Sequence, residues 1–394
     1  MNMSSQLVVE RAKIENRKRE KISGAIWFLF VGLVFCFSNN HNALLIADYC
    51  AFLIFFVACM LMKRRFVIPL HPLMLSMVIL LAFSVVFLPL LDRGTLLSYL
   101  VWIPVMILAV SYRFNKKEID TLMWGFILGA VIMSVLVIVQ KHHYYEPESY
   151  RFSIQIWNHE EIDPNYLAAF LYVGTIFAAH MALHRSRRDL KFVVIMFLGI
   201  ILYAITMTGS RAAVLGIGIA FCGVMLRIFK ARKNAVILFA VTILGALLLI
   251  LVSANMASEV MSRFDFRTLL DTSNMRRLEH WYAAVRCIIQ RPLFGYGAAK
   301  TLDILTEYAG HRGDAHNTLL TLLLHFGLVG SIPILSLLWK IFDKFRKIQN
   351  KDWLFYFFGF LFINLIIANH LGISFWLPIM IFYQIRNREE FQKC

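Results

Sequence analysis

Long apolar runs alternate with short polar segments along almost the whole chain. A run of about 20 apolar residues is long enough to cross the hydrocarbon core of a membrane as a helix. The sequence therefore predicts an all-α polytopic membrane protein, with residues 1–394 forming a single membrane domain. About 12 transmembrane helices are expected, over residues 22–38, 43–62, 70–91, 95–112, 121–140, 164–184, 190–207, 212–229, 235–253, 315–339, 353–369 and 373–385.

Composition supports the membrane class. Hydrophobic residues make up 59% of the 394 positions and charged residues only 16%, which is more apolar surface than a soluble domain can bury. The six cysteines show no metal-ligand spacing and no obvious disulfide pair. Neither a metal centre nor a disulfide framework is predicted from them.

The net charge of +16 could indicate a nucleic-acid partner, but the placement of the charges does not require one. Basic residues gather in short segments between apolar runs, and every second loop is basic. This is the positive-inside pattern of cytoplasmic loops, so both termini are predicted to be cytoplasmic. Two loops then lie on the opposite side of the membrane: a smaller one over residues 141–163 and a large one over residues 254–314.

Three of the predicted helices begin on this non-cytoplasmic side with polar motifs. Helix N-termini present free N–H groups and the positive end of the helix dipole, so three converging N-termini would form an anion site. Asp163 before a proline is also an ordinary helix cap, whereas Asn165 inside a membrane helix needs a polar partner. The motifs are Asp163-Pro164-Asn165, Thr208-Gly209-Ser210-Arg211 and Ala315-His316-Asn317-Thr318.

The arginines of the non-cytoplasmic side are candidate phosphate ligands. The large loop holds seven arginines and one lysine, and a guanidinium group binds phosphate with a rigid two-pronged fork. A helix is predicted over Met275–Arg286, capped by residues 272–274, with Arg277, His280 and Trp281 on one face. The alternative is an amphipathic helix lying on the bilayer.

Arg211, Arg151 and His316 are further candidates for chemistry. Arg211 lies where the helix dipole and the charge bias both disfavour a cation, so an anionic partner is expected, although a snorkelling arginine is the alternative. Arg151 lies at the centre of the smaller loop and is a candidate substrate contact. His316 has the side-chain type that accepts a proton near neutral pH, with a structural histidine as the alternative.

Metal and nucleotide sites are not predicted. Glu160, Glu161 and Asp163 are interpreted as a solvated acidic patch, because no D-x-D pattern occurs. Residues 298–301, Ala-Ala-Lys-Thr, lack the spacing of a phosphate-binding loop for ATP.

Taken in order, these motifs resemble the O-antigen ligase family, which shares a superfamily with O-antigen polymerases. The resemblance extends over about residues 150–335. Arg276 next to Arg277 leaves open which of them occupies the family's arginine position, and the spacing to Trp281 favours Arg277. The matching pieces are Asp163-Pro164-Asn165, Gly209-Ser210-Arg211, Arg277 four residues before Trp281, Pro292–Gly297, His316-Asn317 and Gly327–Gly330.

The resemblance implies a membrane-type glycosyltransferase of the cell inner membrane with a periplasmic active site. Such an enzyme would transfer O-polysaccharide from undecaprenyl pyrophosphate to lipid A-core, with inversion and without metal, ATP or another cofactor. Membrane lipids and these two glycolipids would be its partners. The resemblance assigns His316, Arg211 and Arg277 to catalysis, and substrate binding to Arg151, Asn165, Arg276, Asn317 and Trp281.

Two other functions remain as alternatives. An O-antigen polymerase would use the same donor, and Arg286 eleven residues before Gly297 matches a spacing found in polymerases. A transporter of lipid-linked glycans would carry charges in the middle of its spans and a repeat in two halves. The sequence shows neither, so a ligase is the favoured interpretation.

Overall fold

The computed structural model describes residues 116–140, 151–156, 160–184, 188–231, 272–348, 350–369 and 373–385. The helices predicted over residues 22–38, 43–62, 70–91, 95–112 and 235–253 lie outside the described residues, as do residues 141–150 and 254–271 of the two loops. The described helices are α5 (Lys116–Val139), α6 (Pro164–His184), α7 (Arg188–Thr208), α8 (Arg211–Ala231), α11 (Thr272–Gln290), α12 (Ala298–Ala309), α13 (Thr318–Lys347), α14 (Asp352–Asn364) and α15 (Ile373–Gln384).

The described part of the chain is helical apart from one pair of two-residue strands. Four helices are long and apolar enough to cross a membrane: Glu118–Val139, Pro164–His184, Asp189–Thr208 and Thr318–Lys347. The all-α class is therefore confirmed, and the total of about 12 spans stays a prediction. Seven predicted spans have a helix at their position among the described residues, namely α5 to α8 and α13 to α15.

Several boundaries differ from the prediction. The helix predicted over residues 315–339 begins at Thr318 and continues to Lys347, and the one predicted over residues 353–369 ends at Asn364. The predicted loop helix includes residues 272–274, expected as caps, in its first turn. The short helix α12 was not predicted; it ends at Gly310, whose left-handed backbone lets its N–H group bond to the carbonyl of Thr306.

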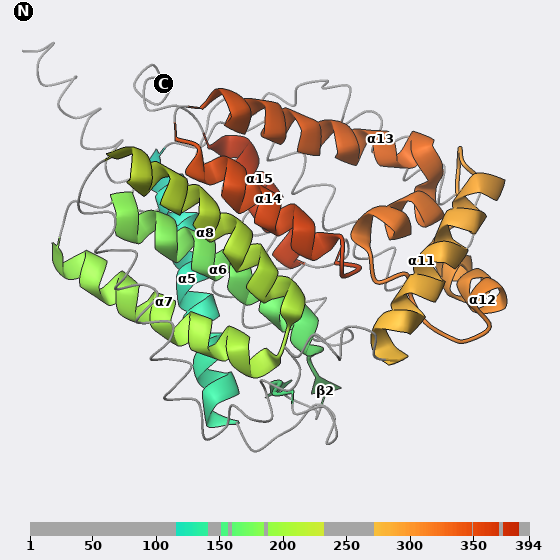
Figure 1. Cartoon of the computed structure of the whole chain (residues 1–394), viewed down its shortest axis with the longest axis horizontal. Coiled ribbons are helices and arrows are strands. Elements are labelled where there is room, and N and C mark those ends of the chain that lie inside the picture. Colours follow the sequence, from blue (N-terminus) through green and yellow to red (C-terminus); the bar gives the residue numbers. More distant parts are fainter. Residues whose placement is uncertain are drawn as a thin grey trace, which may run out of the picture.

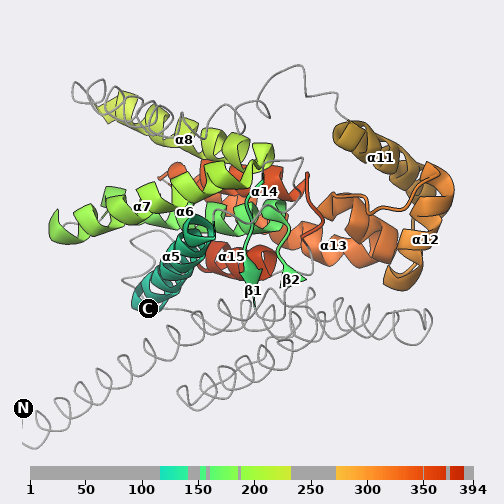
Figure 2. The ribbon, with the colours of Figure 1, turned by 90° about the horizontal axis from the view of Figure 1, so that it is seen from below.

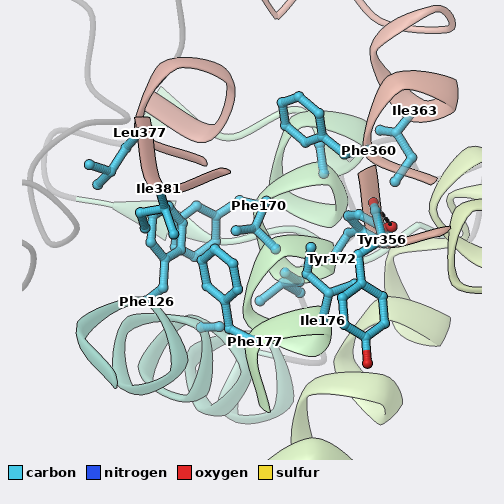
Figure 3. Packing of buried hydrophobic residues seen from close by; sticks show 14 of the residues in the cluster. Phe126, Phe170, Tyr172, Ile176, Phe177, Tyr356, Phe360, Ile363, Leu377 and Ile381 are labelled. Atoms are coloured by element: carbon cyan, nitrogen blue, oxygen red, sulfur yellow. Dashed lines mark hydrogen bonds between the residues drawn. The ribbon is translucent and has the colours of Figure 1, made fainter. Parts of the chain in front are cut away.

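Helix α6 is the centre of the bundle, and α5, α7, α8, α14 and α15 pack against it (Figure 1). Aromatic rings fill the contacts: Phe126 of α5 lies 5.7 Å from Phe170 and 5.6 Å from Phe177, between ring centroids (Figure 3). Small residues allow other helices to approach closely. A Cβ added to Gly359 of α14 would lie 2.5 Å from the carbonyl oxygen of Gly216 in α8, so these two backbones are in contact.

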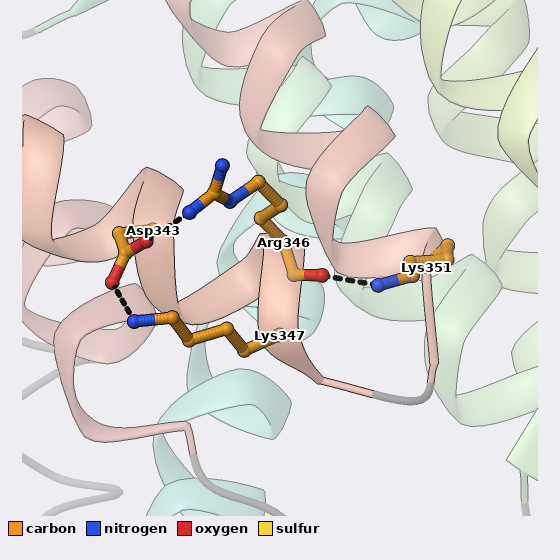
Figure 4. A network of polar contacts seen from close by, with 4 residues as sticks. All are labelled: Asp343, Arg346, Lys347 and Lys351. Atoms are coloured by element: carbon orange, nitrogen blue, oxygen red, sulfur yellow. Dashed lines mark hydrogen bonds and ion pairs between the residues drawn. The ribbon is translucent and has the colours of Figure 1, made fainter.

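The two ends of α6 have different surroundings. At its C-terminal end, His184 Nε2 lies 3.5 Å from Asp352 Oδ2 at the start of α14. This end also carries a basic cluster, in which Arg346 and Lys347 bond to Asp343, and Lys351 donates to the carbonyl of Arg346 (Figure 4). The N-terminal end of α6, about 30 Å away by helix length, lies near the start of α13. Helices α11 and α12 pack on α13 at one side of the bundle (Figure 2).

Candidate active site

The part of the smaller loop that the structure describes is folded against two helix ends. Strand β1 (Gln155–Ile156) pairs antiparallel with β2 (Glu160–Glu161). The Gln140 side chain accepts a hydrogen bond from the N–H group of Gln155 (2.8 Å) and donates one to its carbonyl oxygen (3.2 Å). The Phe152 N–H group donates to the carbonyl of Met207 near the end of α7 (3.2 Å). These bonds fix the position of the neighbouring residue, Arg151.

Arg151 joins the start of α6 to the end of α7. Its Nε donates to the carbonyl oxygen of Thr208 (3.2 Å) and its Nη2 to Oδ1 of Asn165 (2.8 Å). Only 9% of Arg151 is exposed. The polar partner expected for Asn165 is therefore this arginine, and two of the predicted substrate-binding residues lie together.

The turn before α8 depends on Gly209. Its φ of +62° is a left-handed conformation that suits glycine, and its N–H group donates to the carbonyl of Thr206 (3.0 Å). Ser210 is buried, and its carbonyl accepts from the N–H group of Val214 in the first turn of α8. Arg211 is thus the first residue of α8 and is half-buried. Its predicted catalytic role stays a prediction.

Asp163 caps α6, as predicted. Its Oδ1 accepts a hydrogen bond from the N–H group of Asn165 (2.6 Å), and its main-chain carbonyl accepts from that of Leu167 (3.1 Å). Its negative charge also acts on the pKa of His316, which it raises. The start of α6 therefore lies beside the candidate base.

The start of α13 is tied to the turn that follows α14. Asn317 is the N-cap of α13 and accepts from the N–H group of Leu320 (3.1 Å). The Thr318 hydroxyl donates to the carbonyl of Ile367 (2.7 Å) and accepts from the N–H group of Asn369 (2.9 Å). Because Tyr166 of α6 donates to the carbonyl of Ala368 (3.2 Å), the starts of α6 and α13 flank the same turn. The substrate contact predicted for Asn317 stays a prediction.

His316 has an unusual backbone conformation. Its φ is +45°, and among the described residues it is the single non-glycine residue with a positive φ. Such a conformation costs about 1–3 kcal/mol and persists only where neighbouring contacts hold it, often at functional sites. Those contacts are present: Trp281 Nε1 donates to the carbonyl of Ala315 (2.7 Å), and Asp314 Oδ1 accepts from the Ala315 N–H group (2.6 Å).

The surroundings of His316 favour its neutral form. Burial lowers the pKa of His316 from its ordinary value of 6.5, the charge of Asp314 opposes this shift, and the charge of Arg277 adds to it. Burial also raises the pKa of the Asp314 carboxyl. A neutral imidazole near neutral pH has a lone pair with which to accept a proton.

Position distinguishes Arg277 from Arg276. Arg277 is half-buried and its charge acts on His316. Arg276 is exposed, and its main-chain carbonyl is hydrogen-bonded by His280 (2.7 Å). The geometry therefore favours Arg277 as the arginine beside the base, and substrate binding by Arg276 stays a prediction.

Helix α13 is broken at Gly327, and the turn after α11 fills the break. The N–H groups of Tyr296 and Gly297 donate to the carbonyls of Leu324 (2.7 Å) and His325 (3.1 Å). On the other side of the break, the N–H groups of Leu328 and Val329 donate to the carbonyls of Pro292 (2.7 Å) and Leu293 (3.0 Å). Irregular backbone at membrane depth is tolerated when protein groups satisfy it in this way.

Two glycines permit this docking. Gly327 has a φ of +63°, and a Cβ there would lie 2.3 Å from the carbonyl carbon of Leu293. Gly295 has a φ of +68°, and a Cβ there would lie 2.4 Å from the carbonyl oxygen of Leu324. The docked turn leads directly out of α11, so it holds Arg277 and Trp281 at a fixed place relative to α13.

Residues 196–335 match the model of the O-antigen ligase family. This match confirms the resemblance predicted from the motifs over residues 196–335. A Rickettsia conorii (strain ATCC VR-613 / Malish 7) protein with the name "Putative polysaccharide ligase" is 26% identical over 190 residues, which are 45% of this chain and 45% of that protein. The chain thus aligns with about half the length of this relative.

The matched segment contains Arg211, Arg277 and His316, whereas Arg151 and Asn165 lie outside it. Asp314 was not among the candidate residues predicted from the sequence, although an acidic residue two positions before a candidate base was a visible signal. No role was predicted for His280. Among the residues that the structure describes, no three or more His, Cys, Asp or Glu side chains are placed to hold a metal ion.

Proposed function

We propose that this protein is an O-antigen ligase, which transfers polysaccharide from undecaprenyl pyrophosphate to a sugar hydroxyl of lipid A-core. One observation carries the proposal: within the segment that matches the O-antigen ligase family, Arg277 and a strained His316 lie next to the start of α6. Both substrates have lipid tails, so a site at the ends of apolar helices confines donor and acceptor to one leaflet and raises their encounter rate.

The pyrophosphate of the donor is held by cations and helix N-termini. Arg277 and Arg211 provide guanidinium groups, and the positive ends of the helix dipoles of α6, α8 and α13 add to their charge. Negative charge grows on the pyrophosphate as it leaves the sugar. Groups already aimed at that charge stabilise the transition state without reorganising.

His316 takes the proton of the acceptor. The acceptor oxygen forms its bond to the anomeric carbon as the bond from that carbon to the pyrophosphate breaks, and the electron pair leaves with the pyrophosphate. The hydroxyl proton passes to the neutral imidazole. Such general base catalysis contributes about 10²–10⁴ in rate, and a single displacement inverts the anomeric configuration.

Arg151 supports the site from the smaller loop. It is bound to Asn165 at the start of α6 and to Thr208 at the end of α7, so it holds these two helix ends together. Its positive charge adds to the field at the same end of the bundle. We assign it to binding the donor or a core phosphate.

The charges also support an orientation in the cell inner membrane. The basic cluster of Lys344, Arg346, Lys347 and Lys351 lies beside the C-terminal end of α6, opposite the candidate site. If basic ends are cytoplasmic, the site faces the periplasm.

The alternative of a polymerase was predicted from the spacing between Arg286 and Gly297. Arg286 follows Arg277 by nine residues, or about 2.5 helical turns, and so points to the opposite face of α11. It is exposed, with its guanidinium carbon 5.8 Å from the ring centre of Tyr282 and 5.7 Å from that of Tyr308. Gly297 donates its N–H group to α13. This pair therefore adds no support for polymerisation.

The test is transfer by the purified full-length protein in vesicles that contain lipid-linked glycan and lipid A-core, without ATP and with a chelator. We expect sugar joined to lipid A-core, and loss of this product in the His316→Ala variant when its thermal unfolding is unchanged. Longer glycans on undecaprenyl pyrophosphate would instead indicate a polymerase. Near-normal transfer by His316→Ala would remove this residue from the mechanism.

A further inference from the structure

Helix α11 carries a stripe of exposed apolar side chains along its length. Five large side chains at intervals of three and four residues share one face of the helix, and their exposed fractions range from 43% to 71%. The other face is buried against α12 and α13, where Ala284 and Cys287 are fully buried. A contiguous apolar surface of this kind normally marks a contact with lipid or with another molecule. This apolar stripe consists of Met275, Leu278, Tyr282, Val285 and Ile289.

The apolar stripe is continuous with the exposed surface of α13. In the turn after α11, the side chains of Leu293 and Phe294 are exposed as well. The carbonyl of Leu293 accepts a hydrogen bond from the N–H group of Val329 in α13 (3.0 Å), and the side chains of Leu328, Val329 and Ile332 are exposed beside it. Because α13 is long and apolar enough to cross a membrane, its exposed apolar side chains face lipid acyl chains. The apolar stripe therefore extends this lipid-facing surface beyond the break in α13.

Helix α11 also crosses the direction of the spans. In Figure 1, α6 and α8 run diagonally, whereas α11 lies across that direction, at the end of the bundle where α6 begins. A helix that crosses the spans at their end lies parallel to the membrane surface. This is the position of an amphipathic helix in the layer between headgroups and acyl chains.

The polar border of the apolar stripe is basic. The guanidinium carbon of the exposed Arg286 lies 5.8 Å from the ring centre of Tyr282, and that of the exposed Arg291 lies 4.8 Å from the ring centre of Tyr296. No carboxylate of the described residues forms an ion pair with either guanidinium group. Tyrosine rings beside cations are typical of the headgroup layer, where such cations attract the phosphates of anionic lipids.

We propose that α11 is an interfacial helix: its apolar stripe lies among the acyl chains of the leaflet at the end of the bundle where α6 begins, and Arg286 lies at the level of the lipid phosphates. A role at the candidate site and a position on the bilayer were alternatives in the sequence, but two different faces of α11 allow both. The membrane surface thereby fixes the depth of the helix that carries Arg277. The proposal goes beyond the proposed function and does not depend on it.

Photolabelling at the level of single residues tests this position. The purified full-length protein is placed in vesicles of phosphatidylethanolamine and phosphatidylglycerol with a phospholipid that carries a diazirine in its acyl chain, and mass spectrometry locates the label. We expect label on the apolar stripe and on residues 328–332 of α13, which are the internal reference. Asp303 and Glu307, exposed residues of α12, should carry none. A second phospholipid with the diazirine in its headgroup should label Arg286.

Two neighbouring residues provide a matched pair of variants. Ile289→Glu places a carboxylate in the apolar stripe, and Gln290→Glu places the same group on its polar border. Gln290 Oε1 accepts hydrogen bonds from the hydroxyls of Tyr296 (3.1 Å) and Tyr308 (2.7 Å), and a glutamate can still accept both. A carboxylate is costly among acyl chains, so Ile289→Glu should lower acyl-probe labelling of Val285 several-fold relative to residues 328–332. Gln290→Glu should keep the wild-type pattern.

Both variants should keep the wild-type thermal unfolding midpoint in detergent, because Ile289 and Gln290 are exposed, and the labelling pattern of the wild-type protein needs no variant. The proposal is wrong if residues 328–332 carry the acyl-chain label and the apolar stripe carries none. Cross-links between the stripes of two copies of the chain would then assign this face to a dimer. None of these measurements uses glycan transfer, so their failure is distinct from failure of the proposed function.

Discussion

The indole nitrogen of Trp281 donates a 2.7 Å hydrogen bond to the carbonyl oxygen of Ala315, the residue before His316. One turn earlier on the same helix, Arg277 places its charge beside the imidazole. The four-residue spacing between this arginine and this tryptophan thus has a physical meaning. Trp281 holds the loop that carries His316, and Arg277 provides the positive charge beside the imidazole of His316.

We expect Trp281→Phe to weaken catalysis while preserving most of the packing. Phenylalanine keeps an aromatic ring but cannot donate to Ala315, and one such hydrogen bond contributes about 0.5–1.5 kcal/mol. The rate of ligase product formation should fall roughly two- to tenfold. The control is Tyr282→Phe, because Tyr282 is 68% exposed and should tolerate the loss of its hydroxyl. Equal rates for the two variants would contradict a positioning role for the indole.

Arg277→Ala and Arg276→Ala form a second pair. Removing one preorganised charge from a developing anion typically lowers the rate by about 10²–10³. We expect this loss for Arg277→Ala, and at most a few-fold change for the exposed Arg276. Transfer assays on both variants, at matched protein amounts in vesicles, measure it. The assignment is wrong if the Arg276 variant is the inactive one.

The pH dependence should reveal the buried base. His316 acts in its neutral form, so activity falls as the pH drops through its pKa, which burial places below 6.5. The charge of Asp314 raises this pKa; Asp314→Asn should therefore move the acidic midpoint of kcat/KM to lower pH. Asp163→Asn keeps a capping side chain and should move it in the same direction by less. A midpoint that moves to higher pH in either variant would rule out this electrostatic scheme.

Gly327→Ala and Gly295→Ala should destabilise the protein. Both positions have a positive φ, and a methyl group at either would collide with backbone, so each variant should lose at least about 1–3 kcal/mol. Thermal unfolding of the full chain in detergent measures the change. Gly199→Ala and Gly218→Ala are the controls, because a Cβ at these helical positions meets nothing within 4 Å. Those two should be neutral or stabilising by up to about 1 kcal/mol.

Arg151 and Asn165 should behave as one unit. Arg151→Ala and Asn165→Ala each remove the 2.8 Å bond between the two side chains, so the double variant should lose less stability than the sum of the single losses. The expected coupling is about 0.5–3 kcal/mol, measured by unfolding of the four proteins in the same detergent. Strictly additive losses would show that this bond contributes nothing.

Much of the fold could be predicted because membrane helices follow local rules. A span must satisfy its own backbone, so apolar length alone located α5 to α8. Cap chemistry then located the start of α6, where Asp163 precedes Pro164, and the polar motif at residues 208–211 marked the start of α8. These signals involve residues that are neighbours in the sequence, which is why they can be recognised there.

Other features depend on contacts between distant segments. In the sequence, the segment around Gly327 looks like part of one continuous apolar helix. The break cannot be recognised there, because its hydrogen-bond partners lie some thirty residues earlier, in the turn after α11. The spacing to Trp281 already favoured Arg277 over Arg276, but that the charge of Arg277 acts on His316 was visible only in the structure. His280 was placed on the correct face, but its buried, unbonded Nε2 becomes apparent only when Gly313 is seen against it.

The break in α13 has a consequence for biosynthesis. Ribosomes make the turn at residues 291–297 before they make Gly327, so the turn exists before the break in α13 that it fills. Without this turn, four backbone groups at the break would enter the bilayer without hydrogen-bond partners: the carbonyls of Leu324 and His325 and the N–H groups of Leu328 and Val329. Each unpaired group would add several kcal/mol to the free-energy cost of insertion. The order of synthesis therefore makes these hydrogen-bond partners available by the time α13 enters the membrane.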